Sequence, residues 1–134
     1  VDIPFIDMVS LSAKTASVHS SVGDKIGILA SPAVRMTGLF ESALGAFERK
    51  AIWPEPDDYM LRAIRLIKKD GPTQEAAKIL RKASSDLAAQ SAKVQLVACS
   101  EFSLLSSMLQ RADCHIIDTL NVLTQAVIET SVLN

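Results

Sequence analysis

The sequence predicts an α/β fold, with a mostly parallel sheet of about four strands and helices on both faces. Short apolar runs of strand length alternate along the chain with longer stretches that have the period of amphipathic helices. A length of 134 residues, 49% of them hydrophobic, is enough for one domain with a substantial core but short for two. We therefore expect a single α/β domain over residues 1–134.

The first third of the chain alternates between strand-like and helical segments. Residues 3–8 form a short apolar run of strand type, and the Ala- and Ser-rich stretch 10–22 has a helical pattern. Residues 25–30 form a second apolar strand. Ser31 is placed as a helix N-cap because proline follows at the first helical position, and we expect this helix to run to about Phe47.

The middle of the chain holds a brief strand and two helices. The strand covers residues 51–53 and is stopped by two prolines. Asp57 or Asp58 caps a helix that runs to Lys69, where an Asp-Gly-Pro sequence ends it. A longer helix, opened by a threonine, follows over residues 73–92.

The last third repeats the alternation. It contains a strand at 94–98, a helical stretch at 101–109, a strand at 114–117 and an amphipathic helix at 119–133. The apolar surface of the last helix is wider than one packed face requires, so either a missing partner covers it or the helix lies centrally. This order of elements is typical of a Rossmann- or flavodoxin-like domain.

Composition and charge exclude several classes of protein. The 14 Lys and Arg residues are balanced by 15 Asp and Glu residues, so a charge-driven nucleic-acid surface is not expected. No apolar run reaches the length of a membrane span and no signal peptide is visible, so no membrane partner is expected. Two cysteines give no disulfide framework, which favours a reducing, cytoplasmic location. Because the chain starts at Val1 rather than Met, we expect it to be processed or a piece of something longer.

Cys99 is the first candidate for a functional residue. It follows the strand 94–98 directly, and the carboxyl ends of strands are where an open α/β sheet presents its ligand crevice. Backbone N–H groups of the following helix would face the thiol and favour the thiolate. A buried, inert cysteine is the competing interpretation.

Polar groups follow three of the expected strands, and in a parallel sheet these ends lie at one edge. They are Ser31 after the strand 25–30, Cys99, Ser100 and Glu101 after 94–98, and Asp118 and Thr119 after 114–117. Helix capping alone would explain the three hydroxyl residues, but it does not explain Cys99.

The two histidines, His19 and His115, have no partner at metal-ligand spacing, so no metal site is expected. Composition also permits a nucleophilic pair between Cys99 and His115, although nothing in the sequence orients that histidine. No glycine-rich phosphate loop is present.

Four segments resemble the aspartate/glutamate racemase family in the order in which that family carries them. Residues 96–105 resemble its second cysteine motif, Cys-Thr-Glu followed by apolar residues. Residues 24–34 resemble the strand and Thr-x-x-Thr loop that open its second half, and residues 67–71 resemble its Lys-x-Gly helix end. Residues 116–119 resemble its closing strand.

The resemblance implies a cofactor-independent racemase acting on a small acidic amino acid or a related carboxylate. In such enzymes two cysteines flank the α-carbon; one thiolate removes the α-proton and the opposite thiol returns a proton to the other face. Cys99 matches the second of these cysteines.

The same resemblance implies substrate-binding roles for its neighbours. Ser31 and Ser100 would bind the substrate carboxylate, and Lys69 would pair with the side-chain carboxylate, with Lys68 as a rival in the alignment. Glu101 would orient groups around Cys99 rather than react.

The chain also departs from the family pattern. The first catalytic cysteine belongs to an N-terminal half that this chain lacks, and Cys114 does not replace it because it begins a strand at the opposite end of the sheet. Val34 stands where a second threonine is usual, and Ser100 replaces a threonine. We therefore expect a C-terminal half that is inactive alone, has the missing half as a partner, and belongs to a protein that can form a homodimer.

Two alternatives stay open at this point. One is a non-catalytic domain that keeps an acidic-ligand crevice without the chemistry. The other is a related enzyme of the same superfamily, such as a hydantoin racemase or a maleate isomerase, with paired cysteines and a different substrate.

Overall fold

Four parallel strands form the sheet, and their spatial order is β2-β1-β3-β4. The strands are β1 (Lys25–Leu29), β2 (Lys50–Ile52), β3 (Val94–Val97) and β4 (His115–Asp118). The computed structural model describes residues 2–56, 58–111 and 113–133. Every strand pair is parallel, which confirms the predicted α/β class and the mostly parallel sheet.

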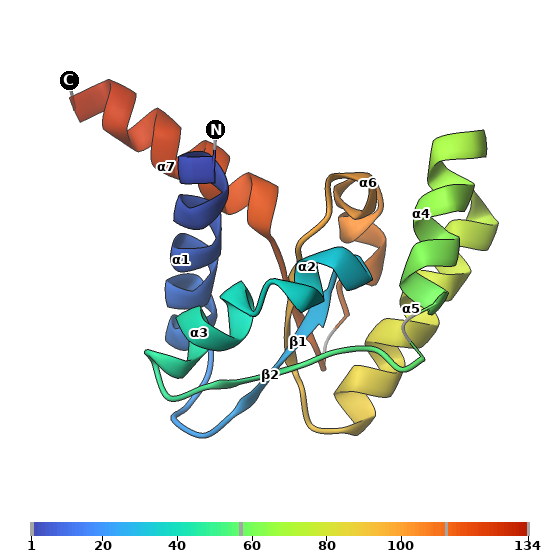
Figure 1. Ribbon diagram of the computed structural model, residues 1–134, viewed down its shortest axis with the longest axis horizontal. Coiled ribbons are helices and arrows are strands. Elements are labelled where there is room, and N and C mark those ends of the chain that lie inside the picture. The colour runs from blue at the N-terminus through green and yellow to red at the C-terminus, as the bar shows by residue number, and fades with distance from the viewer. Residues whose placement is uncertain (1, 57, 112, 134) are drawn as a thin grey trace.

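Helices cover both faces of this sheet, as predicted (Figure 1). Helices α1, α3 and α7 lie on one side of the strands, and α4 and α5 lie on the other. The helical elements are α1 (Asp2–Val18), α2 (Pro32–Met36), α3 (Leu39–Gly45), α4 (Asp58–Asp70), α5 (Gln74–Ala89), α6 (Ser100–Ser103), the 3₁₀ helix η1 (Ser106–Leu109) and α7 (Thr119–Leu133). Within the described residues, none of these helices is both long and apolar enough to cross a membrane.

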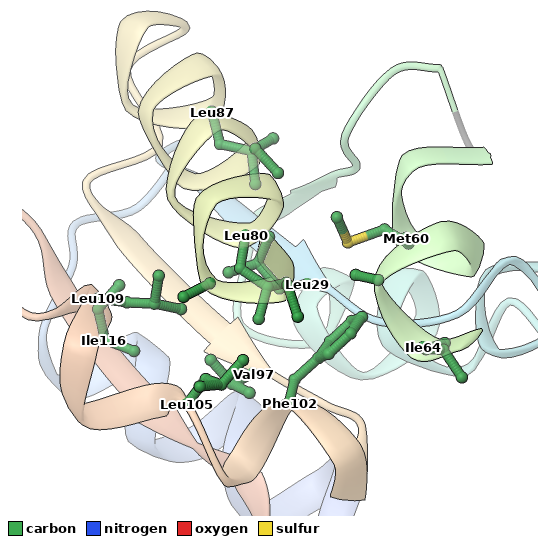
Figure 2. Close-up of a cluster of buried hydrophobic side chains, with 14 of the residues drawn as sticks. Leu29, Met60, Ile64, Leu80, Leu87, Val97, Phe102, Leu105, Leu109 and Ile116 are labelled. Atoms are coloured by element: carbon green, nitrogen blue, oxygen red, sulfur yellow. The ribbon is translucent and has the colours of Figure 1, made fainter. Parts of the chain in front are cut away.

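Two hydrophobic cores result, one on each face of the sheet, because successive strand side chains point to opposite faces. In β3, Leu96 packs toward α1 and α3, whereas Val97 packs toward α4 and α5. Figure 2 shows the second core, where Leu29, Val97 and Phe102 lie together below α5. Phe102 belongs to α6, so this core directly supports the segment that follows Cys99.

The first apolar run is not a strand. Residues 3–8 belong to the 17-residue helix α1, so the strand prediction for this run is wrong. Proline is tolerated in the first turn of a helix, where its missing N–H group has no intrahelical partner, so Pro4 does not interrupt α1.

The helix predicted from Ser31 to about Phe47 is two short helices, α2 and α3. Ser31 does cap α2, and its Oγ accepts a hydrogen bond from the Val34 N–H at 3.3 Å. The break falls at Gly38, whose φ of 69° lies in the left-handed region that glycine adopts without strain. The stretch 101–109 is likewise divided between α6 and η1.

Gly38 offers a test of this break. Replacing Gly38 with alanine should lower the free energy of unfolding by about 1–2 kcal/mol, because a Cβ is disfavoured at positive φ. Gly45 is the matched control: it ends α3, and an added Cβ there meets no atom within 4 Å. Urea denaturation of Gly38→Ala and Gly45→Ala would measure the difference, and equal stabilities would contradict the assignment.

Candidate active site at the carboxyl ends of the strands

Cys99 and Ser31 follow the ends of two neighbouring strands, β3 and β1. The Ala98 N–H donates to the Leu29 carbonyl at 2.9 Å, so the β1–β3 ladder continues to the residues just before this pair. Cys99 is half-buried at the N-cap position of α6, and Ser31 caps α2. Both short helices lie at the same end of the sheet in Figure 1.

The Cys99 thiol has a carboxylate partner. Its Sγ donates to Oε2 of Glu101 at 3.1 Å, and the Ser100 hydroxyl donates to the same oxygen at 3.1 Å. The Lys68 ammonium, from the last turn of α4, lies 3.6 Å from the other oxygen of Glu101. The structure thus brings together Cys99, Ser100 and Glu101 as the sequence predicts.

The thiolate expected at Cys99 is not favoured. Burial, followed by the hydrogen bond to the Glu101 carboxylate, raises the pKa of Cys99 to about 11. The backbone N–H groups of Phe102 and Glu101 act in the opposite direction but are outweighed. For Glu101, the hydrogen bond donated by Cys99 is the main cause that holds its pKa below the usual range. Cys99 is therefore a thiol at neutral pH in this structure.

Lys68, not Lys69, reaches the site. Adjacent helical residues point about 100° apart, so only one of the two can face α6. Lys69 lies instead in a shallow depression with Arg62, Arg65 and Glu75. Of the two candidate lysines, Lys68 is therefore the one beside Glu101.

The residues at the end of β4 anchor the segment that follows Cys99. Asp118 accepts hydrogen bonds from the Ser103 hydroxyl at 2.8 Å, the Ser106 hydroxyl at 3.3 Å and the Leu120 N–H at 3.0 Å. The Thr119 hydroxyl donates to the Val97 carbonyl at 3.0 Å. These bonds tie α6 and η1 to β4. Sequence reasoning missed Ser103 and Ser106, because their contact with Asp118 spans 15 and 12 residues.

A cavity of about 600 Å³ opens beside this anchor. Ser100 and three further serines line it, and the exposed Leu104 and Leu120 belong to its wall. Cys99 is not among the lining residues. Ser100, the residue after Cys99, therefore borders a space of a size suited to small molecules, lined by both hydroxyl and apolar side chains.

The opposite end of the sheet holds the remaining candidates. His115 begins β4, where it stacks on His19 with 4.1 Å between ring centroids. The alternative pairing of Cys99 with His115 is therefore wrong, since the two residues occupy opposite ends of parallel strands. Cys114 is buried next to His115, at the end of the sheet where it was expected. Among the residues that the structure describes, no three His, Cys, Asp or Glu side chains are grouped to hold a metal ion.

Comparisons with known proteins agree with this architecture. The structure superimposes on an aspartate racemase of Picrophilus torridus with a TM-score of 0.75 and 19% sequence identity. The match covers 92% of this chain and 51% of that one, so the chain spans about half the length of the solved structure. No curated protein sequence matches the chain.

The sequence itself matches a family model. The model describes the Asp/Glu/Hydantoin racemases, and it aligns with residues 1–127. The match therefore includes every strand and the polar groups at the three strand ends. This chain belongs to the Asp/Glu/Hydantoin racemase family.

Proposed function

We propose that the protein interconverts the enantiomers of a small acidic amino acid of the aspartate or glutamate type, with Cys99 as one of two proton-transfer groups. The observation that carries the proposal is the position of the Cys99 thiol at the end of β3, hydrogen-bonded to Glu101, with Ser31 after the neighbouring strand β1. An α-proton is weakly acidic, so its removal needs groups that exchange protons directly with the α-carbon.

The neighbouring side chains suit the two carboxylates of such a substrate. The Ser31 and Ser100 hydroxyls, on adjacent strand ends, would bind the α-carboxylate, with the Ser100 hydrogen turning from Glu101 to the substrate. The Lys68 ammonium, two-thirds exposed, would bind the side-chain carboxylate. No cofactor is needed for this chemistry, and we place the protein in the cytoplasm.

We further propose that a second α/β half supplies the opposing proton-transfer group. Leu120, Val127 and Ile128 expose about half of their surface along α7, and an apolar stripe of this kind is typical of a contact surface. Val132 and Leu133, also predicted on that surface, lie outside the described side chains. A homodimer would cover α7 as well, and sedimentation of the full-length protein distinguishes the two arrangements.

A substrate panel tests the proposed function. Each enantiomer of aspartate, glutamate and a 5-substituted hydantoin is incubated with the full-length protein, and the products are separated by chiral chromatography. We expect interconversion of aspartate or glutamate. Conversion of the hydantoin alone would support the related-enzyme alternative, and binding of an acidic amino acid without conversion would support a non-catalytic domain.

Ser100→Ala tests the carboxylate-binding role. Removing a hydrogen bond to a charged group costs about 1.5–3 kcal/mol, so kcat/KM should fall by roughly 10- to 100-fold, mainly through KM. Ser85→Ala is the matched control because Ser85 is exposed on α5, away from the site. A Ser100→Ala protein with the kinetics of the control would contradict the role.

A further inference from the structure

We infer that Glu101 holds Cys99 in the thiol state, so that Cys99 is the proton donor in the resting protein and the opposing group is the base. This inference rests on the proposed function, and it specifies the orienting role that the resemblance implies for Glu101. It also fixes the direction in which the first proton moves.

The hydrogen-bond geometry supports this assignment. An ionised carboxylate only accepts hydrogen bonds, so the hydrogen shared between Cys99 Sγ and Glu101 Oε2 belongs to the sulfur. Oε2 also accepts from the Ser100 hydroxyl, which fixes the carboxylate on the side of the thiol. Lys68, next to Oε1, favours the ionised form of Glu101.

Among the charged groups described around Cys99, Glu101 is the one hydrogen-bonded to the sulfur. Asp118, at the end of β4, is occupied by two serine hydroxyls and the Leu120 N–H. On the α2 side Ser31 is uncharged, and Arg35, the charged residue of α2, pairs with Glu55 at 2.8 Å. The Lys68 ammonium lies beside the Glu101 carboxylate, 3.6 Å from Oε1. Burial is the largest cause of the raised pKa of Cys99, and the hydrogen bond to Glu101 adds to it, since both disfavour a negative charge on sulfur.

The consequence for the reaction is a defined starting state. The opposing base takes the α-proton, the S–H bond of Cys99 breaks, and its proton forms the new bond to the α-carbon while the electron pair stays on sulfur. The Glu101 carboxylate repels the thiolate that this step leaves, so it makes the donation harder and favours the return of a proton to sulfur, which restores the thiol. The enantiomer whose α-hydrogen points away from Cys99 is therefore the one that the resting protein processes without prior proton redistribution.

Alkylation of Cys99 as a function of pH tests the inference without any turnover. Iodoacetamide reacts with the thiolate, so its rate reports the pKa of the thiol. The full-length protein carries Cys114→Ser, and any other cysteine is followed separately by peptide mass spectrometry. Glu101→Gln should move the Cys99 midpoint down by about one pH unit or more, because both the carboxylate charge and its acceptor role are lost.

Lys68→Met should shift the midpoint in the opposite direction, because Glu101 then acts on the thiol without a neutralising cation. Lys69→Met is the matched control and should leave the profile unchanged, since Lys69 lies away from Glu101. General damage to the fold would expose Cys99 and accelerate alkylation in both Glu101→Gln and Lys68→Met, so opposite shifts identify the electrostatic effect. An unchanged profile in Glu101→Gln, or shifts of the same sign, would overturn the inference.

The alkylation experiment and the substrate panel test separate claims. If the opposite shifts occur in a protein that interconverts no enantiomers, the thiol state of Cys99 stands and the racemase proposal fails. If interconversion occurs and Glu101→Gln leaves the alkylation profile unchanged, the racemase proposal stands and the role of Glu101 is refuted.

Discussion

Replacing Cys99 with serine is expected to slow the interconversion of enantiomers by about 10²–10⁴-fold in the full-length protein, the range lost with one general acid–base group. A serine hydroxyl gives up its proton far less readily than a thiol, so it is a poor donor and a poorer base. Its size is similar, so Ser31 and Ser100 should still bind substrate. The loss should therefore appear in kcat more than in KM.

Cys114→Ser is the control for this substitution. Cys114 is the other cysteine of the chain and lies at the amino end of the sheet, away from the strand ends that carry Ser31 and Cys99. Steady-state kinetics of both variants should separate them clearly. A Cys99→Ser protein with the kcat of the parent would remove Cys99 from the mechanism.

Phe102→Ala is expected to lower the free energy of unfolding by about 3–5 kcal/mol, the cost of truncating a fully buried aromatic side chain. Phe102 has no exposed surface and fills the space between the sheet and α4 (Figure 2). The substitution leaves a cavity directly under α6. Guanidinium or urea denaturation followed by circular dichroism measures the change.

Leu104→Ala is the matched control, two residues further along and 62% exposed. It should change the free energy of unfolding by less than about 0.5 kcal/mol. A Phe102→Ala cost no larger than that of Leu104→Ala would mean that α6 is not held by this core. The Cys99–Glu101 geometry would then lack the support assigned to it.

Most of the sheet could be predicted from sequence because buried parallel strands are short, continuous apolar runs with clear boundaries. Residues 25–30 and 94–98 have this character, and both are strands. The same pattern failed for residues 3–8, because periodicity alone does not distinguish a short apolar run in a strand from one in an apolar helix. The break at Gly38 was missed because a single glycine inside a helical pattern is ambiguous until its φ is known.

The candidate site was predictable where its parts are close in sequence. Cys99, Ser100 and Glu101 are consecutive or nearly so, and their contacts follow from one tight turn. The protonation state of the thiol was not predictable, because burial and the orientation of the carboxylate decide it. The choice between Lys68 and Lys69 depends on the rotation of α4 about its axis. The sequence resemblance is ambiguous by one residue at this point, so it does not give that rotation.

Contacts between residues far apart in the sequence are the remaining features that could not be predicted. The buried Gln95 inside β3 is accommodated because Ser84 in α5 donates to its side-chain oxygen at 2.6 Å. Nothing in the local sequence of either residue indicates this pair. The same is true of Asp118 and Ser103, which hold the segment after Cys99 against β4.

Exchange of the α-hydrogen with deuterated water tests the central claim, that Cys99 transfers a proton at the α-carbon. The parent protein and Cys99→Ser are incubated with each enantiomer of aspartate and glutamate, and the α-hydrogen signal is followed by proton NMR. We expect the signal of at least one substrate to disappear with the parent protein and to persist with Cys99→Ser. Loss of the signal at the parental rate in Cys99→Ser would contradict it.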